Sequence, residues 1–372
     1  MRKLIIYSAF PVSNAWATRF AFNDYRQYGF DVEIWSTREI FYSKDQMALE
    51  KAGSKNYLYK NKFLVKIKTI NEFEQKVSKI DTDTLFWVIN RGPVEFTRDN
   101  HDLDLFNHYK IKYIDNHLLP YHVPIHPYLK FRYYASELKR RIYNYKRKPI
   151  MVLGTGRLGR AQVKNIFPNR FIYKSVPSLN VLWTKQKPEL NSRYIVYVDE
   201  AVNHSPDAAL HGEQNPCHDV NGFYLRINRV FKQIENWTGI QIVIAASGKF
   251  FYDINPFENR EIFYEKTQNL IQHSEMVIGH ASSGLEQAIV ENKVVIILYD
   301  KGFIKQKNKK IHDHSILYGT HPIWTEKLTK SIFETMNHLN VPRYQKTLLD
   351  YLKEDEVTGS FVDSVIGAFN KI

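Results

Sequence analysis

The feature that most constrains the fold of this chain is a repeated alternation of short apolar runs with longer helix-like stretches. Runs rich in β-branched and aromatic residues are typical of strands. The predicted strands are residues 3–7, 31–35, 64–67, 84–89, 112–114 and 150–153 in the first half, and 194–198, 240–244, 276–278 and 294–298 in the second. A helical segment is expected over 14–28, ending at Gly29. This alternation predicts an α/β protein with parallel sheets wound by helices.

The length of 372 residues is more than one small core accommodates, so we expect two domains. A polar stretch of weak periodicity over 178–192 places the boundary near residue 188. The prediction is a Rossmann-like, doubly wound domain at 1–187, a second at 188–345, and a helical tail at 346–372 that could pack back on the first. Two such domains facing a cleft would present their strand carboxyl ends to it, where α/β sheets bind ligands.

Composition excludes several classes of protein. Cys217 is the single cysteine, so a disulfide scaffold is excluded. The hydrophobic share of 44% argues against global disorder. No apolar run approaches the roughly 18 residues that span a bilayer. The apolar start over residues 4–7 soon turns polar, which indicates a buried strand rather than a signal peptide, and we expect a cytoplasmic protein.

Asp199 and Glu200 directly follow the predicted strand at 194–198. A carboxylate at that edge of a doubly wound sheet could take a proton from an acceptor hydroxyl, if burial and a neighbouring charge tune its pKa. It could also act as a covalent nucleophile. A helix-capping or surface acid is the plainer alternative. The polar loop at 203–219 holds three histidines, but their spacing matches no close pair of metal ligands, so no metal site is predicted.

Two further strand ends carry residues suited to a phosphate group. Ser247, Gly248 and Lys249 follow the strand at 240–244, where backbone amides and a lysine can hold phosphate. An ordinary turn is the alternative there.

The stretch 279–288 is the most informative one, because it follows a predicted strand and opens a helix. It contains His280, and Ser282 and Ser283 lie at the predicted helix N-terminus, where amides and the helix dipole favour an anion. Glu286 lies one turn further in. A capping serine with Glu286 closing a capping box is the alternative, although a cap needs one serine only.

The order of these features resembles the nucleotide-binding half of GT-B glycosyltransferases: a strand, H-x-S-S-x-x-x-E, a helix and a second apolar strand. An acidic pair, a strand-end loop and paired serines follow one another as in bacterial sialyltransferases and Kdo transferases, which use CMP-activated sugars. The segments 197–200, 205–207 and 244–246 are similar to those of a group of bacterial surface-polysaccharide transferases. The resemblance covers about residues 194–299.

This resemblance implies a transferase that moves a sugar, such as a CMP-activated sialic-acid-like or Kdo-like residue, to a hydroxyl of a bacterial glycan or glycolipid. Asp199 or Glu200 would act in the chemistry. The residues that would bind the nucleotide are Ser247, Gly248, Lys249, His280, Ser282, Ser283 and Glu286. No metal and no separate cofactor would be needed, because helix N-termini and lysine can neutralise the leaving phosphate.

The chain departs from the family pattern at Ser247-Gly248, where such families carry His-Pro. A histidine there would contact the donor phosphate or assist the leaving group, and His280 or His204 are the candidates to replace it. The resemblance assigns the acceptor to the first domain, whose strand ends at 8–14, 90–92 and 115–117 would face the cleft. His117 is a candidate base among them, against the alternative of a structural histidine.

Other functions stay open. Residues 154–159 fit G-x-G-x-x-G after a strand, which suggests an NAD(P)-dependent oxidoreductase or a plain glycine-rich turn. No strand ending in an acidic residue follows about 20 residues later, as a dinucleotide site would require. The net charge of +13 and the basic, aromatic stretches 133–148 and 305–310 suit nucleic acid, an anionic membrane surface or a solvated face. No nucleic-acid-binding motif supports the first of these, so no nucleic-acid partner is expected.

Overall fold

A computed structural model describes residues 2–51, 58–90, 101–117, 149–157, 171–174, 186–202, 208, 214–248, 250–352 and 360–370. The chain divides into two compact units. The first unit consists of Met1–Lys44, Leu58–Pro177 and Leu349–Ile372, and the second of Asp45–Tyr57 and Ser178–Leu348. Helix α3 (Lys44–Lys51) and the π-helical turn η4 (Leu348–Leu352) each span a border between these segments.

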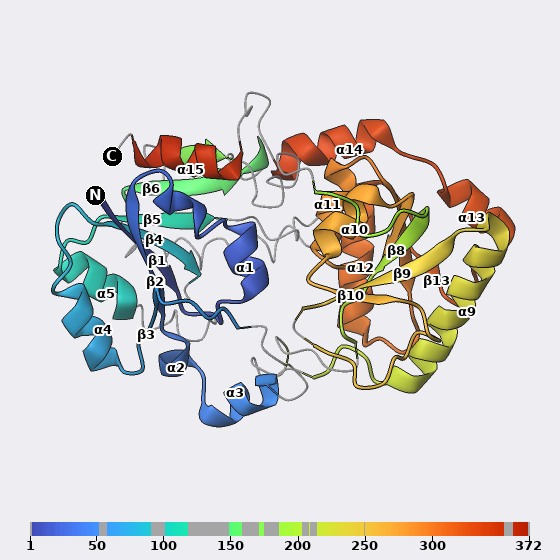
Figure 1. Ribbon diagram of the computed structural model, residues 1–372, viewed down its shortest axis with the longest axis horizontal. Helices are drawn as coiled ribbons and strands as arrows, with labels where there is room; N and C mark the ends of the chain where they lie inside the picture. The colour runs from blue at the N-terminus through green and yellow to red at the C-terminus, as the bar shows by residue number, and fades with distance from the viewer. Residues whose placement is uncertain are drawn as a thin grey trace, which may run out of the picture. The chain divides into compact units, whose positions relative to one another are not determined.

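The first unit is built on a parallel sheet in which the described residues form seven strands, ordered β3-β2-β1-β4-β5-β6-β7 (Figure 1). Its elements are β1 (Arg2–Ser8), α1 (Asn14–Arg19), η1 (Asp24–Arg26), β2 (Phe30–Ser36), α2 (Arg38–Phe41), β3 (Leu64–Lys66), α4 (Ile70–Val77), β4 (Leu85–Asn90), α5 (His101–His108), β5 (Tyr113–His117), β6 (Met151–Thr155), β7 (Phe171–Lys174) and α15 (Phe361–Phe369). The strand order reverses beside β1, as in Rossmann folds.

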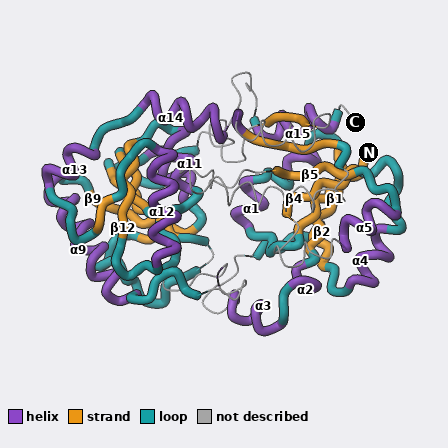
Figure 2. The backbone as a smooth tube through the Cα atoms, turned by 180° about the vertical axis from the view of Figure 1, so that it is seen from behind, coloured by secondary structure: helices purple, strands orange, loops and turns teal. Residues whose placement is uncertain are grey.

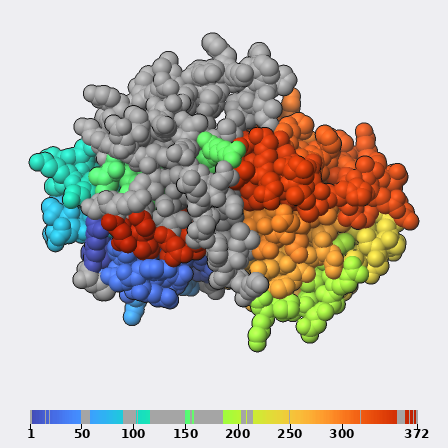
Figure 3. Space-filling view, turned by 90° about the horizontal axis from the view of Figure 1, so that it is seen from above, coloured from blue at the N-terminus to red at the C-terminus, as the bar shows by residue number. Residues whose placement is uncertain are grey.

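Both faces of this sheet are covered by core residues, as the alternating side chains of β1 show. Leu4 and Ile6 belong to a core cluster that includes α15, while Ile5 and Tyr7 belong to a second cluster with α4 and α5. Alternate residues of a strand point to opposite faces, so a strand covered on both sides is apolar at every position. The C-terminal helix α15 is thus part of the first unit, and in Figure 3 it lies in dark red beside the blue N-terminal residues.

The second unit repeats the plan with a sheet whose described strands are ordered β10-β9-β8-β11-β12-β13 and are all parallel. Helices surround these strands in Figure 2. The elements are β8 (Tyr194–Val198), α9 (Val220–Thr238), β9 (Gln241–Ala246), β10 (Ile262–Tyr264), α10 (Thr267–His273), β11 (Met276–Gly279), α11 (Gly284–Val290), β12 (Val294–Tyr299), α12 (Lys305–Tyr318), β13 (Ile323–Trp324), α13 (Lys330–Met336) and α14 (Val341–Thr347). The order reverses between β8 and β11, which is therefore the topological switch point.

Helix α9, the longest helix among the described residues, shows why these segments fold as they do. Its buried residues, among them Phe223, Ile227 and Ile234, recur at helical spacing and form one apolar face. The Asp219 side chain caps the start by accepting from the Gly222 amide, and Gly239 ends the helix at φ 67°, a left-handed conformation that glycine adopts readily.

The structure confirms the predicted α/β architecture with two Rossmann-like sheets, and each predicted apolar run coincides with a strand. The predicted helix over 14–28 is wrong in extent, because α1 ends at Arg19 and only the 3₁₀ turn η1 follows. Ala21, at φ 52°, breaks the helix, and Phe20, Phe22 and Tyr25 are buried in the sheet's core instead. Among the described residues no helix has the length and apolar character needed to cross a membrane.

Candidate functional site

The candidate site lies at the carboxyl edge of the second unit's sheet, around its switch point. Asp199 and Glu200 follow β8, Ser247 and Gly248 follow β9, and residues 280–283 follow β11. Because all these strands are parallel, their carboxyl ends share one edge. The structure brings the first and third of these groups into direct contact, since the Ala281 amide donates to Glu200 Oε1 at 2.6 Å.

Asp199 is a buried acid with one engaged oxygen. The Tyr252 hydroxyl donates to Oδ2 at 2.7 Å, and the Tyr224 hydroxyl donates to Tyr252 at 3.2 Å. Oδ1 is buried and has no partner with hydrogen-bond geometry among the described residues. Burial raises the pKa of Asp199 to about 6, against the opposing effects of Tyr252 and the backbone amides of Ala201 and Glu200. Asp199 is therefore a carboxyl group that exchanges protons near neutral pH.

Glu200, in contrast, is held in its ionised form. Its Oε1 accepts from Ala281, and its Oε2 pairs with the Lys307 ammonium on α12. Burial alone would raise the pKa of Glu200, but Lys307 and the Ala281 amide lower it to about 2. The adjacent acids thus have pKa values on either side of their ordinary range, a separation typical of a proton-transferring group beside a permanently charged one.

His280 is fully buried, and both ring nitrogens are used inside the unit. Nδ1 lies 2.7 Å from the Leu298 carbonyl and Nε2 lies 3.0 Å from the Tyr197 hydroxyl. Because a carbonyl only accepts, Nδ1 carries the proton and Nε2 accepts from Tyr197. Burial lowers the pKa of the ring, so it is neutral. These bonds tie the end of β11 to β8 and β12, which is a positioning role beneath the site.

The turn with the paired serines is more self-contained than the sequence suggests. The amides of Gly284, Leu285 and Glu286 donate within the turn, to Ser282 Oγ at 3.2 Å, Ser282 O at 3.1 Å and Ser283 O at 3.3 Å. Ser283 is the N-cap residue of the seven-residue α11, yet its side chain makes no capping bond to it, so the described turn is not a capping box. An anion at this turn would have to compete with these internal bonds. Glu286 is buried.

The other predicted residues are only partly accounted for. Ser247 and Gly248 are half-buried in a turn, where the Phe250 amide donates to the Ser247 carbonyl at 3.3 Å. Lys249, His204 and the basic stretch 133–148 lie outside the described residues. His117 is the last residue of β5 in the first unit, and its side chain also lies outside them.

Gly156 in the glycine-rich motif has a structural explanation. It adopts φ +66°, and the Asp350 backbone lies where a side chain would project. Both requirements call for glycine without any ligand, which favours the interpretation of this motif as a plain turn. The rest of the motif from residue 158 lies outside the described residues.

Sequence reasoning missed Lys307 and Tyr252 as site residues. Lys307 belongs to the basic run 305–310, yet its side chain is 9% exposed while that of Lys309 is 56% exposed. The helical periodicity of the sequence could have indicated that Lys307 is buried, because it lies one turn before the buried Ile311. Nothing local marks Tyr252, which reaches Asp199 across 53 positions.

A second network, centred on the buried Asp300, secures the connection from β12 to α12. The Arg226 guanidinium on α9 contacts both oxygens of Asp300, at 2.6 Å from Nη2 to Oδ1, and Asp219 Oδ2 at 2.9 Å. Asp300 also accepts from the Gly302 amide and the Thr325 hydroxyl, each at 2.7 Å. Its hydrogen bonds, chiefly those to Asp300, raise the pKa of Arg226 above its ordinary value. The network fixes the loop that leads to Lys307.

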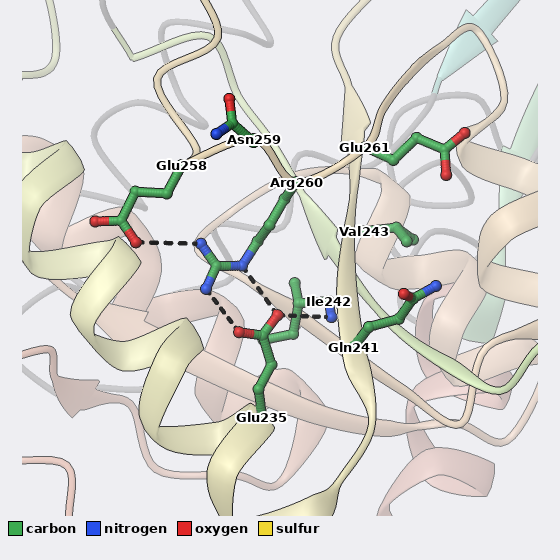
Figure 4. Close-up of a pocket in the computed structure, with 8 residues that line it drawn as sticks. All are labelled: Glu235, Gln241, Ile242, Val243, Glu258, Asn259, Arg260 and Glu261. Carbon is green, nitrogen blue, oxygen red and sulfur yellow. Dashed lines mark hydrogen bonds and ion pairs between the residues drawn. The ribbon is translucent and has the colours of Figure 1, made fainter.

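A cavity of about 440 Å³ lies elsewhere on this unit (Figure 4). It is lined by Glu235, Gln241, Ile242, Val243, Glu258, Asn259, Arg260 and Glu261. These residues include the start of β9, whereas the candidate site follows the strand ends. Arg260 contacts Glu235 through two nitrogens, at 2.7 and 3.0 Å, so the polar lining is largely occupied with a structural ion pair. Among the described residues no group of three or more His, Cys, Asp or Glu side chains could hold a metal ion.

No protein-family model and no curated protein sequence matches the chain. Solved structures resemble it over its whole length or nearly so, among them the following three. UDP-GlcNAc 2-epimerase from Methanocaldococcus jannaschii has 10% identity, a TM-score of 0.51 and coverage of 100% of both chains. TcCGT1 in complex with UDP has 11% identity, a TM-score of 0.54 and coverage of 100% of this chain and 98% of its own. The wall teichoic acid polymerase TagF has 10% identity, a TM-score of 0.51 and coverage of 99% and 88%.

At these identities the likeness establishes the fold. The chain has the two-unit, Rossmann-like architecture of GT-B proteins, as the sequence resemblance implied. An activity does not follow from a fold, because one fold hosts many reactions.

Proposed function

We propose that the chain is a glycosyltransferase that moves a sugar from a nucleotide donor to a hydroxyl of a bacterial surface glycan. The acid pair carries this proposal: Asp199, with its raised pKa, lies beside an ionised Glu200 at the switch point of the second sheet. Open α/β sheets bind ligands at such points. A nucleotide donor is supported by the GT-B fold and by the UDP complex of TcCGT1.

In the proposed reaction Asp199 is the general base. Its Oδ2 is occupied by the Tyr252 hydroxyl, so Oδ1 takes the acceptor's proton. The acceptor oxygen then bonds to the sugar's anomeric carbon while the bond from that carbon to the phosphate oxygen breaks, and the nucleotide leaves with the electron pair. Glu200 keeps its charge and orients the Ala281 amide.

The finer assignments belong to the same proposal. The sequence resemblance over 194–299 supports a CMP-activated, sialic-acid-like or Kdo-like donor. The similar structures of TcCGT1 and TagF, in contrast, were obtained with UDP and with CDPG. Ser282, Ser283 and the loop at 247–249 would contact the nucleotide, and the first unit, with His117, would take the acceptor. The net charge of +13 suits anionic ligands and, through residues 133–148, the inner face of a membrane.

A nucleotide panel tests this function. Thermal shifts are measured with CMP, CDP, UDP, GDP, NADH and an oligonucleotide, followed by assays of nucleotide release from the matching sugar donors. The expected result is stabilisation by one nucleotide and release that depends on an added glycan acceptor. Isomerisation of the donor without an acceptor would indicate an epimerase instead. Binding of NADH or the oligonucleotide alone would overturn the proposal.

Replacing Tyr252 with Phe is expected to move the acidic limb of the pH–rate profile upward. Wild-type kcat should rise with pH through about 6, where Asp199 ionises. Tyr252→Phe removes a hydrogen bond that favours the carboxylate, and such bonds to charged groups are worth about 1.5 kcal/mol, or about one pH unit. Tyr344→Phe, which loses one bond to the Lys293 carbonyl, is the matched control and should leave the limb in place. If the wild type and Tyr252→Phe have identical pH–rate profiles, Asp199 does not take part in the proton transfer.

A further inference from the structure

Lys307 differs from the other lysines of the run 305–310. Lys305, Lys309 and Lys310 are exposed, whereas the Lys307 side chain is 9% exposed and pairs with Glu200 across 107 positions of the chain. A buried lysine with a carboxylate partner is not a solvated surface charge. Its role must therefore be sought at the site rather than on a membrane or nucleic-acid face.

The Glu200 carboxylate joins three elements. It follows β8, accepts from the Ala281 amide in the β11–α11 turn, and pairs with Lys307 in the first turn of α12. Ala281 directly precedes Ser282, so the position of the serines depends on this amide. The groups whose charge or dipole acts on Glu200, or is acted on by it, are Lys307, His280, Asp199, Tyr197, Tyr318 and the Ala281 amide. Among them Lys307 is the cation, because His280 is neutral.

We infer that Lys307 is a positioning residue that, through Glu200, holds the β11–α11 turn in the arrangement that receives the donor nucleotide. The part of this inference that concerns the nucleotide rests on the proposed function, whereas the part that concerns the turn does not. Without Lys307 the buried Glu200 charge has no counter-charge among these groups, and a buried carboxylate in that state takes up a proton or moves toward water. Either change weakens its bond to Ala281 and loosens the turn.

Hydrogen exchange of peptides covering residues 279–286 tests the turn directly. Lys307→Met is compared with Lys309→Met, which makes the same substitution on the same helix but removes a lysine that is exposed and pairs with the half-buried Asp313. We expect exchange in this segment to rise at least about tenfold in Lys307→Met, as for loss of a hydrogen bond to a charged group. Lys309→Met should stay near the wild-type rate, and Lys307→Arg should restore most of the protection. Equal exchange in the two Met variants would overturn the inference.

A uniform loss of protection across the second unit would also overturn it, because Lys307 would then be needed only for folding. If Lys307→Met does not fold, the double variant Lys307→Met/Glu200→Ala, which leaves no buried charge and no acceptor for the Ala281 amide, replaces it. The same outcomes then apply to that variant.

The second readout is the affinity for the nucleotide that stabilises the wild type. Lys307→Met should weaken it by about tenfold, whereas Lys309→Met should leave it within about twofold of wild type. Unchanged affinity beside a loosened turn would overturn the nucleotide part of the inference. If the wild type binds no nucleotide at all, the proposed function fails, while the exchange data still decide whether Lys307 positions the turn.

Discussion

Replacing Asp199 with Asn should lower kcat by about 10²–10⁴-fold, the usual contribution of a general base. Asn has the shape of Asp and can still accept from Tyr252, but it cannot take a proton. Because Asp199 ionises at about 6 and is buried, the charge that Asn removes is one that burial disfavours. The folded protein should therefore be no less stable above pH 6, and stabilisation by the bound nucleotide should persist.

The matched control for this prediction is Asp253→Asn. Asp253 is an exposed acid one residue beyond Tyr252, in the same β9–β10 connection. Its substitution should leave kcat within about twofold of wild type, as for surface changes away from the chemistry. Steady-state rates at pH 7 to 8 and nucleotide titrations give both quantities. Transfer by Asp199→Asn at the wild-type rate would exclude Asp199 as the base, and loss of nucleotide binding with kcat unchanged would make it a binding residue.

Replacing Asp300 with Ala should lower the free energy of unfolding of the second unit by about 3–5 kcal/mol. Asp300 is fully buried, and the Arg226 side chain that it pairs with is 12% exposed. The substitution leaves this guanidinium with Asp219 alone and removes the acceptor for the Gly302 amide and the Thr325 hydroxyl. Each of these groups loses a bond that water does not readily replace.

Denaturant titration, with hydrogen exchange to assign the transition to the second unit, measures this loss. Glu334→Ala is the control, because its pair with Lys330 is exposed on both sides and such pairs contribute little. Asp300→Asn should lose less than Asp300→Ala, since it retains an acceptor for Gly302. An effect of Asp300→Ala no larger than that of Glu334→Ala would show that the network is not structural.

Apolar periodicity predicted the sheets well because strands buried on both faces are apolar at nearly every position. The runs at 194–198 and 294–298 are continuous in this sense, and both are central strands. Short edge strands escaped prediction, since β10 and β13 have three and two residues and are only half-buried. The extent of the first helix also escaped, because packing of Phe20 and Tyr25 against the sheet overrides the local helical pattern.

The acid pair and the serine turn were predictable as places where chemistry could occur, since each directly follows a strand. Their roles were not. Glu200 and Asp199 are neighbours in sequence, yet one has its pKa lowered to about 2 and the other raised to about 6. His280 looked like a ligand of the nucleotide, and its two internal hydrogen bonds give it a structural task.

The sequence by itself determined the order and type of the elements, and hence which residues stand at strand ends, because backbone propensity and burial period are local properties. The tertiary structure decided which side chains meet: Lys307 with Glu200, Tyr252 with Asp199 and Arg226 with Asp300, over separations of 107, 53 and 74 positions. Charge and proton affinity at the site depend on burial and on these distant partners, which no local pattern encodes.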